Sequence, residues 1–254
     1  MKRRKAGIGI FVIVLIITAV RVKSMDSHRI SGRILAENIA GPGMLRLVEQ
    51  SMQARARKTS VTEIAVKERK YPQAALTFDD GPDIRYTPLL LDGLKERNVR
   101  VSFFLLGEKV EQYPELVERM QKEGHLVGNH TYHHVQLNKL NETKAREEIL
   151  KTNNLIYETT GVYPLYLRPP FGAWKKNLEL CVEMLPVFWT IDTLDWKVQN
   201  TEKIVRTVQE QIEDGAIILM HDEYDTSVEA ALQVVDELKN QEYELVTVDQ
   251  LILP

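Results

Sequence analysis

Two adjacent carboxylates, Asp79 and Asp80, are the first residues in the chain whose types and spacing indicate chemistry. They follow an apolar run at 74–78 that is typical of a buried β-strand, and Gly81-Pro82 then forces a turn. A turn at a strand end can bring both carboxylates into one pocket, where they repel each other unless a cation lies between them or one acts as a base. The pair therefore predicts a metal ligand beside a general base. The alternative is a solvated turn.

Three histidines lie within five residues further along the chain: His130, His133 and His134. His130 and His134 are four residues apart, so one turn of helix would place both imidazoles on the same side. Two imidazoles at this spacing are a common ligand pair for a divalent metal. His133 is the alternative second ligand. The alternative without a metal site is a cluster of histidines on the protein surface.

A proline-rich motif follows another apolar run at 165–168. Pro169-Pro170 predicts a rigid, extended loop with few free backbone donors. Phe171 keeps its backbone N–H, which such a loop can aim at a developing oxyanion. Arg168 is a candidate for holding a carboxylate such as Asp79 in its ionised form. The alternative is a plain proline corner with a surface arginine.

Two later apolar runs also end in polar residues. Asp192 and Asp195 follow one run, and His221 ends the next. An aspartate that is hydrogen-bonded to an imidazole orients the ring and raises its pKa, which suits a general acid. The spacing leaves open whether Asp192 or Asp195 is this partner. Trp196 and Leu219 are candidates for the walls of a small apolar pocket.

The elements that position these residues are alternating strands and helices from residue 71 onward. This alternation predicts a parallel sheet, open or closed into a barrel, with its site at the C-terminal ends of the strands. The predicted strands are 74–78, 101–106, 125–128, 165–168, 187–191, 216–220 and 244–248. The predicted helices are 87–96, 114–122, 144–158, 177–185, 202–213 and 227–239. The charge-rich stretch 142–151 is interpreted as a solvated helix face.

The first 23 residues have a different character. Four basic residues at 2–5 precede an uncharged, mostly apolar run at 6–20, and Arg21 and Lys23 follow. Because a good cleavage site is hard to find, the pattern favours an uncleaved signal-anchor at 1–23 over a cleaved signal peptide. The remainder of the chain is then expected outside the cytoplasm at the cell membrane, or secreted if the segment is cleaved.

Residues 24–70 are expected to form a stem, with an amphipathic helix at 44–58 and a short strand at 60–66. Residues 71–254 are expected to form the catalytic domain. This part carries 18 basic and 31 acidic residues, a net charge of -13, which argues against nucleic acid as a partner. Cys181 is the single cysteine, so no intrachain disulfide is possible, and we interpret it and His125 as structural.

Taken together, the motifs resemble those of the polysaccharide deacetylases with the NodB-homology domain, also named carbohydrate esterase family four. The resemblance covers about residues 71–254 and implies a distorted (β/α)7 barrel. The five matching motifs are Thr77-Phe78-Asp79-Asp80-Gly81-Pro82, His130-Thr131-x-x-His134, Arg168-Pro169-Pro170-Phe171-Gly172, Asp192-x-x-Asp195-Trp196 and Leu219-x-His221.

The resemblance implies a set of metal ligands and a set of reacting groups. The ligands are Asp80, His130 and His134, and the metal is usually zinc, with cobalt, manganese and nickel as alternatives. The reacting groups are the base Asp79 and the acid His221. Asp195 is the carboxylate partner of His221, and Arg168 holds Asp79 in position. The substrate contacts are the Phe171 N–H, which faces the oxyanion, and Trp196 and Leu219, which line the pocket for the acetyl methyl group.

The implied activity is hydrolysis of N-acetyl groups on N-acetylglucosamine of a cell-wall or extracellular polysaccharide. Peptidoglycan is the first choice, because the anchor would hold the domain next to the wall. Chitin oligomers, exopolysaccharide, muramic residues and O-acetyl xylan are alternatives. A catalytically inert carbohydrate-binding protein on the same fold is the alternative from another class. The expected partners are this polysaccharide and the membrane, with no nucleic acid and no protein partner.

Overall fold

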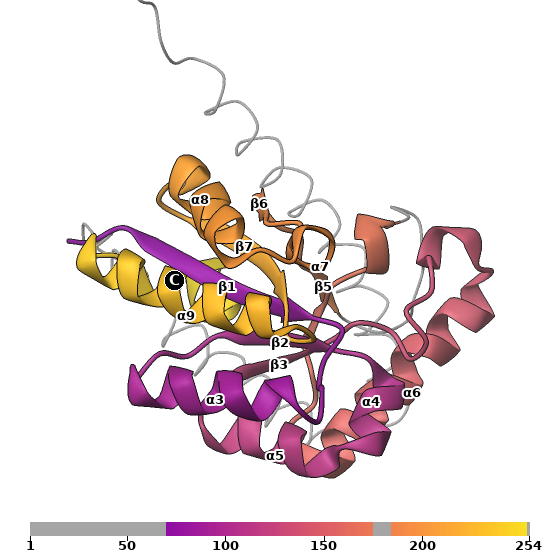
Figure 1. Cartoon of the computed structure of the whole chain (residues 1–254). Coiled ribbons are helices and arrows are strands. Elements are labelled where there is room, and N and C mark those ends of the chain that lie inside the picture. Colours follow the sequence, from indigo (N-terminus) through magenta and orange to yellow (C-terminus); the bar gives the residue numbers. More distant parts are fainter. Residues whose placement is uncertain (1–69, 175–183, 253–254) are drawn as a thin grey trace, which may run out of the picture. The chain divides into compact units, whose positions relative to one another are not determined.

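The computed structural model describes residues 70–174 and 184–252. The predicted signal-anchor and stem, Cys181 and nearly all of the helix expected at 177–185 lie outside these residues. Within the described residues the chain forms a curled parallel sheet with helices packed around it (Figure 1). None of the helices in these two ranges combines the length and the apolar character needed to cross a bilayer.

The sheet contains eight strands, and every pair of neighbours runs parallel. Their order is β5-β4-β3-β2-β1-β7-β6, with β8 paired to β1, so β1 is central. The strands are β1 (Gln73–Asp79), β2 (Ser102–Leu105), β3 (Leu126–Asn129), β4 (Tyr166–Leu167), β5 (Leu185–Pro186), β6 (Ile191–Asp192), β7 (Ala216–His221) and β8 (Glu244–Leu245).

The single strand expected at 187–191 is wrong, because this stretch is divided between the two ends of the sheet. Strand β5 pairs with β4 at one end of the sheet, and strand β6 pairs with β7 at the other end. Between them, Val187 N–H donates to Leu167 O at 2.8 Å and Thr190 N–H donates to Ile217 O at 2.9 Å. One short stretch therefore bonds to both sheet ends and curls the sheet upon itself. The expected distorted barrel is confirmed in this partly closed form.

Five predicted helices are confirmed to within two residues at either end. They are α3 (Tyr86–Glu96), α5 (Pro114–Lys122), α6 (Glu142–Thr160), α8 (Thr201–Gln211) and α9 (Asp225–Asn240). The sequence patterns did not indicate α4 (Gly107–Gln112), α7 (Asp195–Val198), α10 (Val248–Ile252) or the 3₁₀ turns η1 (Leu137–Lys139) and η2 (Pro170–Gly172). All are six residues or shorter, too short for a helical period to emerge.

The strand expected at 244–248 is too long by three residues. Strand β8 ends at Leu245, and Val248 begins α10. The Val248 N–H donates to the Ser102 hydroxyl at 3.0 Å, and the Thr247 N–H donates to the Gln250 side chain at 3.2 Å. Side-chain acceptors therefore replace a strand partner at these two positions.

Successive side chains along β1 point alternately to the hydrophobic core and to the face that carries the candidate site. Ala74, Leu76 and Phe78 belong to the main hydrophobic cluster between sheet and helices. The intervening residues point to the other face, inside the curl, where Ala75 packs in a second apolar cluster. Thr77 and Asp79 share that inner face, so the strand itself turns the carboxylate towards the interior.

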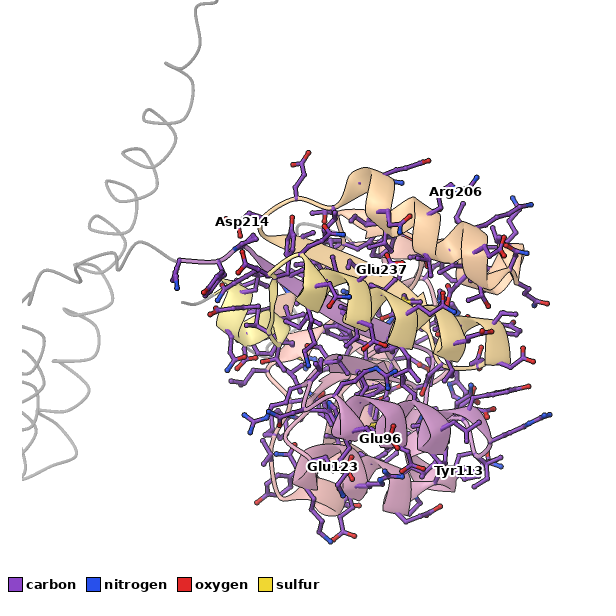
Figure 2. All side chains as sticks on the ribbon, turned by 60° about the vertical axis from the view of Figure 1, so that its left-hand side comes forward. Glu96, Tyr113, Glu123, Arg206, Asp214 and Glu237 are labelled. Atoms are coloured by element: carbon purple, nitrogen blue, oxygen red, sulfur yellow. The ribbon has the colours of Figure 1, made fainter. Side chains whose placement is uncertain are left out.

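Helix α9 lies between α3 and α8 along the outer side of the sheet (Figure 1). Glu237 on α9 accepts a hydrogen bond from the Gln209 side chain of α8 at 2.7 Å, and Figure 2 shows Glu237 where the two helices meet. On the other flank, α4, α5 and α6 contact one another. Both groups of helices contact the sheet, at β3 on one flank and at β7 and β8 on the other.

Candidate metal centre and catalytic site

The candidate residues gather at the C-terminal edge of the sheet. Asp79 ends β1, His130 follows β3, Arg168 follows β4, Asp192 ends β6 and His221 ends β7. This placement confirms the expectation that the polar motifs meet at the strand ends. Each of the five sequence motifs contributes a residue to one region of the molecule.

Asp80, His130 and His134 present three ligand atoms that all lie within 4.8 Å of one another. Asp80 Oδ1 is 3.4 Å from His130 Nε2 and 3.5 Å from His134 Nε2. Asp80 Oδ1 is also buried without a hydrogen-bond partner in the described part of the chain. A buried carboxylate oxygen that faces two imidazole nitrogens is an arrangement that a cation satisfies.

The tautomer of His130 supports this fit. Its Nδ1 lies 2.7 Å from the Arg168 backbone oxygen, which can only accept, so Nδ1 carries the proton. Nε2 then presents its lone pair towards Asp80. Burial lowers the pKa of His130 to about 3 against the opposing charge of Asp80, so the ring stays neutral. The Asp-His-His set therefore has the chemistry of a divalent metal site.

The helical turn that was expected to pair His130 with His134 does not form, so this prediction is wrong, although the two rings do lie together. The segment from 130 to 136 is irregular, and Thr131 and His134 have positive φ values of 67° and 53°. The Thr131 N–H donates to the Asn129 side chain at 2.6 Å, and Thr131 Oγ1 accepts from Val135 N–H at 3.2 Å. These local bonds fold a tight loop that places the ring centroids 5.0 Å apart.

His133 does not join the ligand set. Its side chain is 58% exposed, and its Nδ1 lies 2.8 Å from Glu148 Oε1. His130 and His134 point to one side of the loop, and His133 bonds instead to helix α6. The structure therefore excludes His133 as the alternative second ligand.

Arg168 and Asp79 form a fully buried pair on one side of the metal site. Arg168 Nη1 donates to Asp79 Oδ1 at 2.8 Å and to Thr77 Oγ1 at 2.6 Å. The guanidinium also lies over the Phe104 ring, 4.3 Å from its centroid. Burial raises the pKa of Asp79, and the charge of Arg168 opposes part of that rise. The free oxygen, Oδ2, is 3.7 Å from His130 Nε2.

His221 and Asp195 form a second pair on the other side. His221 Nδ1 donates to Asp195 Oδ1 at 2.8 Å, and the His221 backbone N–H donates to Asp195 Oδ2, also at 2.8 Å. Burial by itself would lower the pKa of His221, but the Asp195 carboxylate outweighs it and raises the pKa to about 9. His221 Nε2 lies 3.9 Å from Asp80 Oδ2. Asp195, and not Asp192, is thus the partner of this histidine.

A cavity of about 490 Å³ opens beside these groups. His221 and Asp80 line its polar part, and Phe171, Trp196 and Leu219 line its apolar part. Leu219 is buried, whereas Trp196 is 47% exposed and stands at the rim. A smaller cavity of about 300 Å³, lined in part by His125, lies at the N-terminal ends of β2 and β3.

The loop after β4 is not extended throughout, contrary to expectation. Pro169 is extended, but η2 follows at once, and Phe171 has a positive φ of 60°. Phe171 is 61% exposed as a residue, and its ring centroid lies 4.5 Å from that of His134. The turn therefore brings the Phe171 ring against His134, one of the candidate metal ligands.

Sequence reasoning missed several residues that support the site. Trp189 lines the cavity, and Thr77 was quoted only as part of a motif although it binds Arg168. The interpretation of 142–151 as a solvated face is wrong for Glu148, which binds the histidine loop. Asp222, directly after His221, is fully buried and packs against Gly81. Its position next to the catalytic candidate was the available signal.

The chain matches known proteins over the same region. A family model described as polysaccharide deacetylase matches residues 67–188. The "Peptidoglycan-N-acetylglucosamine deacetylase PgdA" of Listeria monocytogenes is 41% identical over 185 residues, covering 73% of this chain and 40% of that protein. The "Peptidoglycan-N-acetylglucosamine deacetylase" of Bacillus cereus is 39% identical over 186 residues, covering 70% of this chain and 68% of that protein.

A solved structure of a similar protein has the same fold. The peptidoglycan deacetylase PdaC from Bacillus subtilis superposes with a TM-score of 0.70 at 41% sequence identity, covering 72% of this chain and 91% of that one. The chain thus spans only 40% of the length of the Listeria protein but nearly all of the solved Bacillus subtilis domain.

Proposed function

The chain belongs to the polysaccharide deacetylase family, and we propose that it is a metal-dependent hydrolase that removes N-acetyl groups from a cell-wall polysaccharide. The products are acetate and a free amino sugar. One observation carries this proposal: an Asp-His-His set lies between a buried carboxylate and a buried, carboxylate-bound imidazole. Metal-assisted amide hydrolysis uses a Lewis acid with a base on one side and an acid on the other.

Asp80, His130 and His134 would hold the divalent cation. Zn²⁺ is the metal we propose, because two imidazoles and one carboxylate are typical ligands of catalytic zinc. Co²⁺, Mn²⁺ and Ni²⁺ accept similar donors and are the alternatives. When bound, such a cation supplies Lewis acidity to the acetamide carbonyl and to water.

Asp79 acts as the general base in this mechanism. Its Oδ2 faces the ligand set, while Oδ1 is fixed by Arg168. As water adds to the amide carbon, Asp79 takes its proton. Arg168 is a positioning residue, since it holds the carboxylate in one orientation and leaves one oxygen free. The raised pKa of Asp79 makes it a stronger base than an exposed aspartate.

His221 acts as the general acid on the opposite side. Its proton on Nε2 goes to the amine nitrogen as the C–N bond breaks. Asp195 holds Nδ1 and keeps Nε2 turned towards the site. Because the pKa of His221 is raised to about 9, the ring is protonated at neutral pH and can give up this proton.

Phe171, Trp196 and Leu219 receive the substrate in this proposal. The Phe171 backbone N–H donates to the oxyanion that forms on the carbonyl oxygen. Trp196 and Leu219 enclose the acetyl methyl group, since both line the cavity beside His221.

Peptidoglycan N-acetylglucosamine is the substrate we propose. The relatives from Listeria monocytogenes and Bacillus cereus bear names with this substrate, and the acidic charge of residues 71–254 suits an amino-sugar product. We also propose that residues 1–23 anchor the chain in the cell membrane, with the catalytic part outside, because a basic flank precedes an apolar run.

Acetate release from purified peptidoglycan by the full-length chain tests this function. We expect release that a chelator abolishes and that a divalent metal restores. The same assay on chitin oligomers, O-acetyl xylan and muramic-acid substrates separates the alternatives. No release from any of these polymers by the metal-loaded protein would contradict the proposed activity.

A further inference from the structure

Glu148 on α6 makes three contacts with the loop that carries the histidine ligands. Its Oε2 accepts the Tyr132 backbone N–H at 3.0 Å and the His133 backbone N–H at 2.9 Å. Its Oε1 lies 2.8 Å from His133 Nδ1. One carboxylate therefore binds two consecutive backbone donors and a ring nitrogen between the two metal-ligand candidates.

These backbone donors need a partner because the loop is not a helix. Thr131, just before Tyr132, and His134, just after His133, both have positive φ values. In that conformation the Tyr132 and His133 N–H groups point together towards α6 and meet one carboxylate oxygen. A charged acceptor for two N–H groups is stronger than a neutral one, so Glu148 stabilises this unusual backbone.

Helix α6 holds the loop from its other end as well. Asn129, directly before His130, donates its side-chain amide to Ile149 O at 2.9 Å and to Asn153 Oδ1 at 2.6 Å. Ile149 and Asn153 are fully buried, so this part of α6 is fixed in the core. His130 is thus held between two points that are both bound to the same helix.

We propose that Glu148 is a positioning residue for the metal centre. It fixes the loop backbone so that the His130 and His134 rings face Asp80, and it touches neither the metal nor the substrate. This inference rests on the proposed metal site and adds a residue outside the five sequence motifs. The effect reaches the rings through the backbone of residues 132 and 133, and not through the imidazole of His133.

Metal affinity of the full-length protein is the direct test. The dissociation constants for Zn²⁺ and Co²⁺ are measured by competition with a chromogenic chelator, together with the visible absorption of the Co²⁺ form. Glu148→Ala is expected to weaken binding by about 10- to 100-fold and to change the Co²⁺ spectrum, as loss of an outer support for a ligand does. Glu148→Gln keeps an acceptor oxygen for both N–H groups and is expected to recover most of the affinity.

Two further variants serve as controls. Glu147→Ala removes the same charge from an exposed position on the same helix and is expected to leave the affinity unchanged. His133→Ala removes only the ring contact and is expected to cost less than threefold. If His133→Ala weakened binding as much as Glu148→Ala, the ring and not the backbone would transmit the effect, and the proposal would be overturned.

A purely structural role gives a different result. In that case Glu148→Ala would lower the melting temperature, while the folded variant would bind both metals with the affinity and spectrum of the parent protein. This result would overturn the proposal. The test is separate from the proposed activity: a parent protein that binds metal but releases no acetate would refute the deacetylase function and leave the role of Glu148 to be decided by the affinities.

Discussion

Asp79 and His221 are register partners at the ends of the neighbouring parallel strands β1 and β7. Paired residues on adjacent strands point to the same face of the sheet, so the two side chains turn inward together. The proposed base and acid are therefore spaced by the sheet ladder itself and not by flexible loops. Asp80, the next residue after the proposed base, is a candidate metal ligand, and its Oδ2 lies 3.9 Å from His221 Nε2.

The proposed base gives the first prediction. Asp79→Asn keeps the shape of the side chain but cannot take a proton from water. We expect the rate of acetate release to fall by about 100- to 10,000-fold, the usual contribution of a general base. Metal binding should persist, because Asp79 is not in the ligand set. Acetate release at the parental rate, measured with metal content confirmed, would remove Asp79 from the role of base.

The pair Asp195 and His221 predicts a change in the pH profile. The pKa of His221 is about 9 because Asp195 binds it, and a general acid is lost as the pH rises through its pKa. Asp195→Asn removes the negative charge, so the pKa should fall and the alkaline limb of kcat should move to lower pH. A pH–rate series on both proteins checks this. An alkaline limb that does not move would assign that limb to another group.

Removal of a proposed metal ligand should abolish metal binding without unfolding the protein. His130→Ala eliminates one of the three proposed ligands. We expect loss of bound metal and of acetate release, whereas the fold persists because the rest of the core is unchanged. Metal content by elemental analysis and circular dichroism together check the result. Full activity in the His130 variant, or activity of the parent protein after exhaustive chelation, would exclude a metal-dependent reaction.

Most of the site could be predicted from sequence because its residues lie directly after apolar runs. Parallel strands end at one edge, so Asp79, His130, Arg168 and His221 had to meet once the alternation was recognised. The choice between Asp192 and Asp195 could not be made in this way. It depends on α7, a four-residue helix that begins at Asp195 and leaves no periodic signal.

The features that sequence patterns did not indicate depend on contacts between distant segments. The crossing from β5 to β6 resembles one strand in sequence, and only its bonds to both sheet ends reveal two. The histidine loop has helical spacing but folds irregularly, because Glu148 and Asn129 satisfy its backbone. Glu148 itself lies in a charge-rich stretch, where composition favours solvent exposure.

The buried ring of His125 leads us to predict that the folded protein loses stability in mild acid. It is buried and its Nδ1 accepts the Val101 N–H at 3.1 Å, and burial lowers its pKa from 6.5 to about 4. Between these values the unfolded chain binds a proton that the folded protein does not, so the free energy of unfolding falls as the pH falls from 6.5 to 4. One pKa unit corresponds to about 1.4 kcal/mol, which gives about 2 kcal/mol at pH 5.

Urea unfolding at pH 7.5 and pH 5 measures this effect. His125→Asn keeps an acceptor for the Val101 N–H but cannot titrate in this range, so its loss between the two pH values should be smaller by about 2 kcal/mol. Other titrating groups, including the metal ligands, contribute equally to both proteins. Equal losses in the parent and the variant would mean that His125 is not the group responsible.

The contact between Gly81 and Asp222 gives the last prediction. A Cβ added at Gly81 would lie 2.5 Å from Asp222 Oδ1 and 2.9 Å from Oδ2. Gly81 does not have a positive φ, so alanine is excluded by this contact and not by its backbone conformation. Asp222 cannot turn away easily, since it is fully buried and the Thr87 hydroxyl binds its other oxygen.

Gly81→Ala is therefore expected to cost about 1–3 kcal/mol of unfolding free energy, as overpacking of a buried site does. Because Asp80 precedes Gly81 directly, the same strain should shift a metal ligand and weaken Zn²⁺ binding. Asp222→Ala removes the opposing oxygens, so adding Gly81→Ala to it should cost little more. A double-mutant cycle measured by urea unfolding and by Zn²⁺ affinity checks both effects. If the two changes were simply additive, the glycine would be required by something other than Asp222, since residues in contact show a coupling energy of about 0.5–3 kcal/mol.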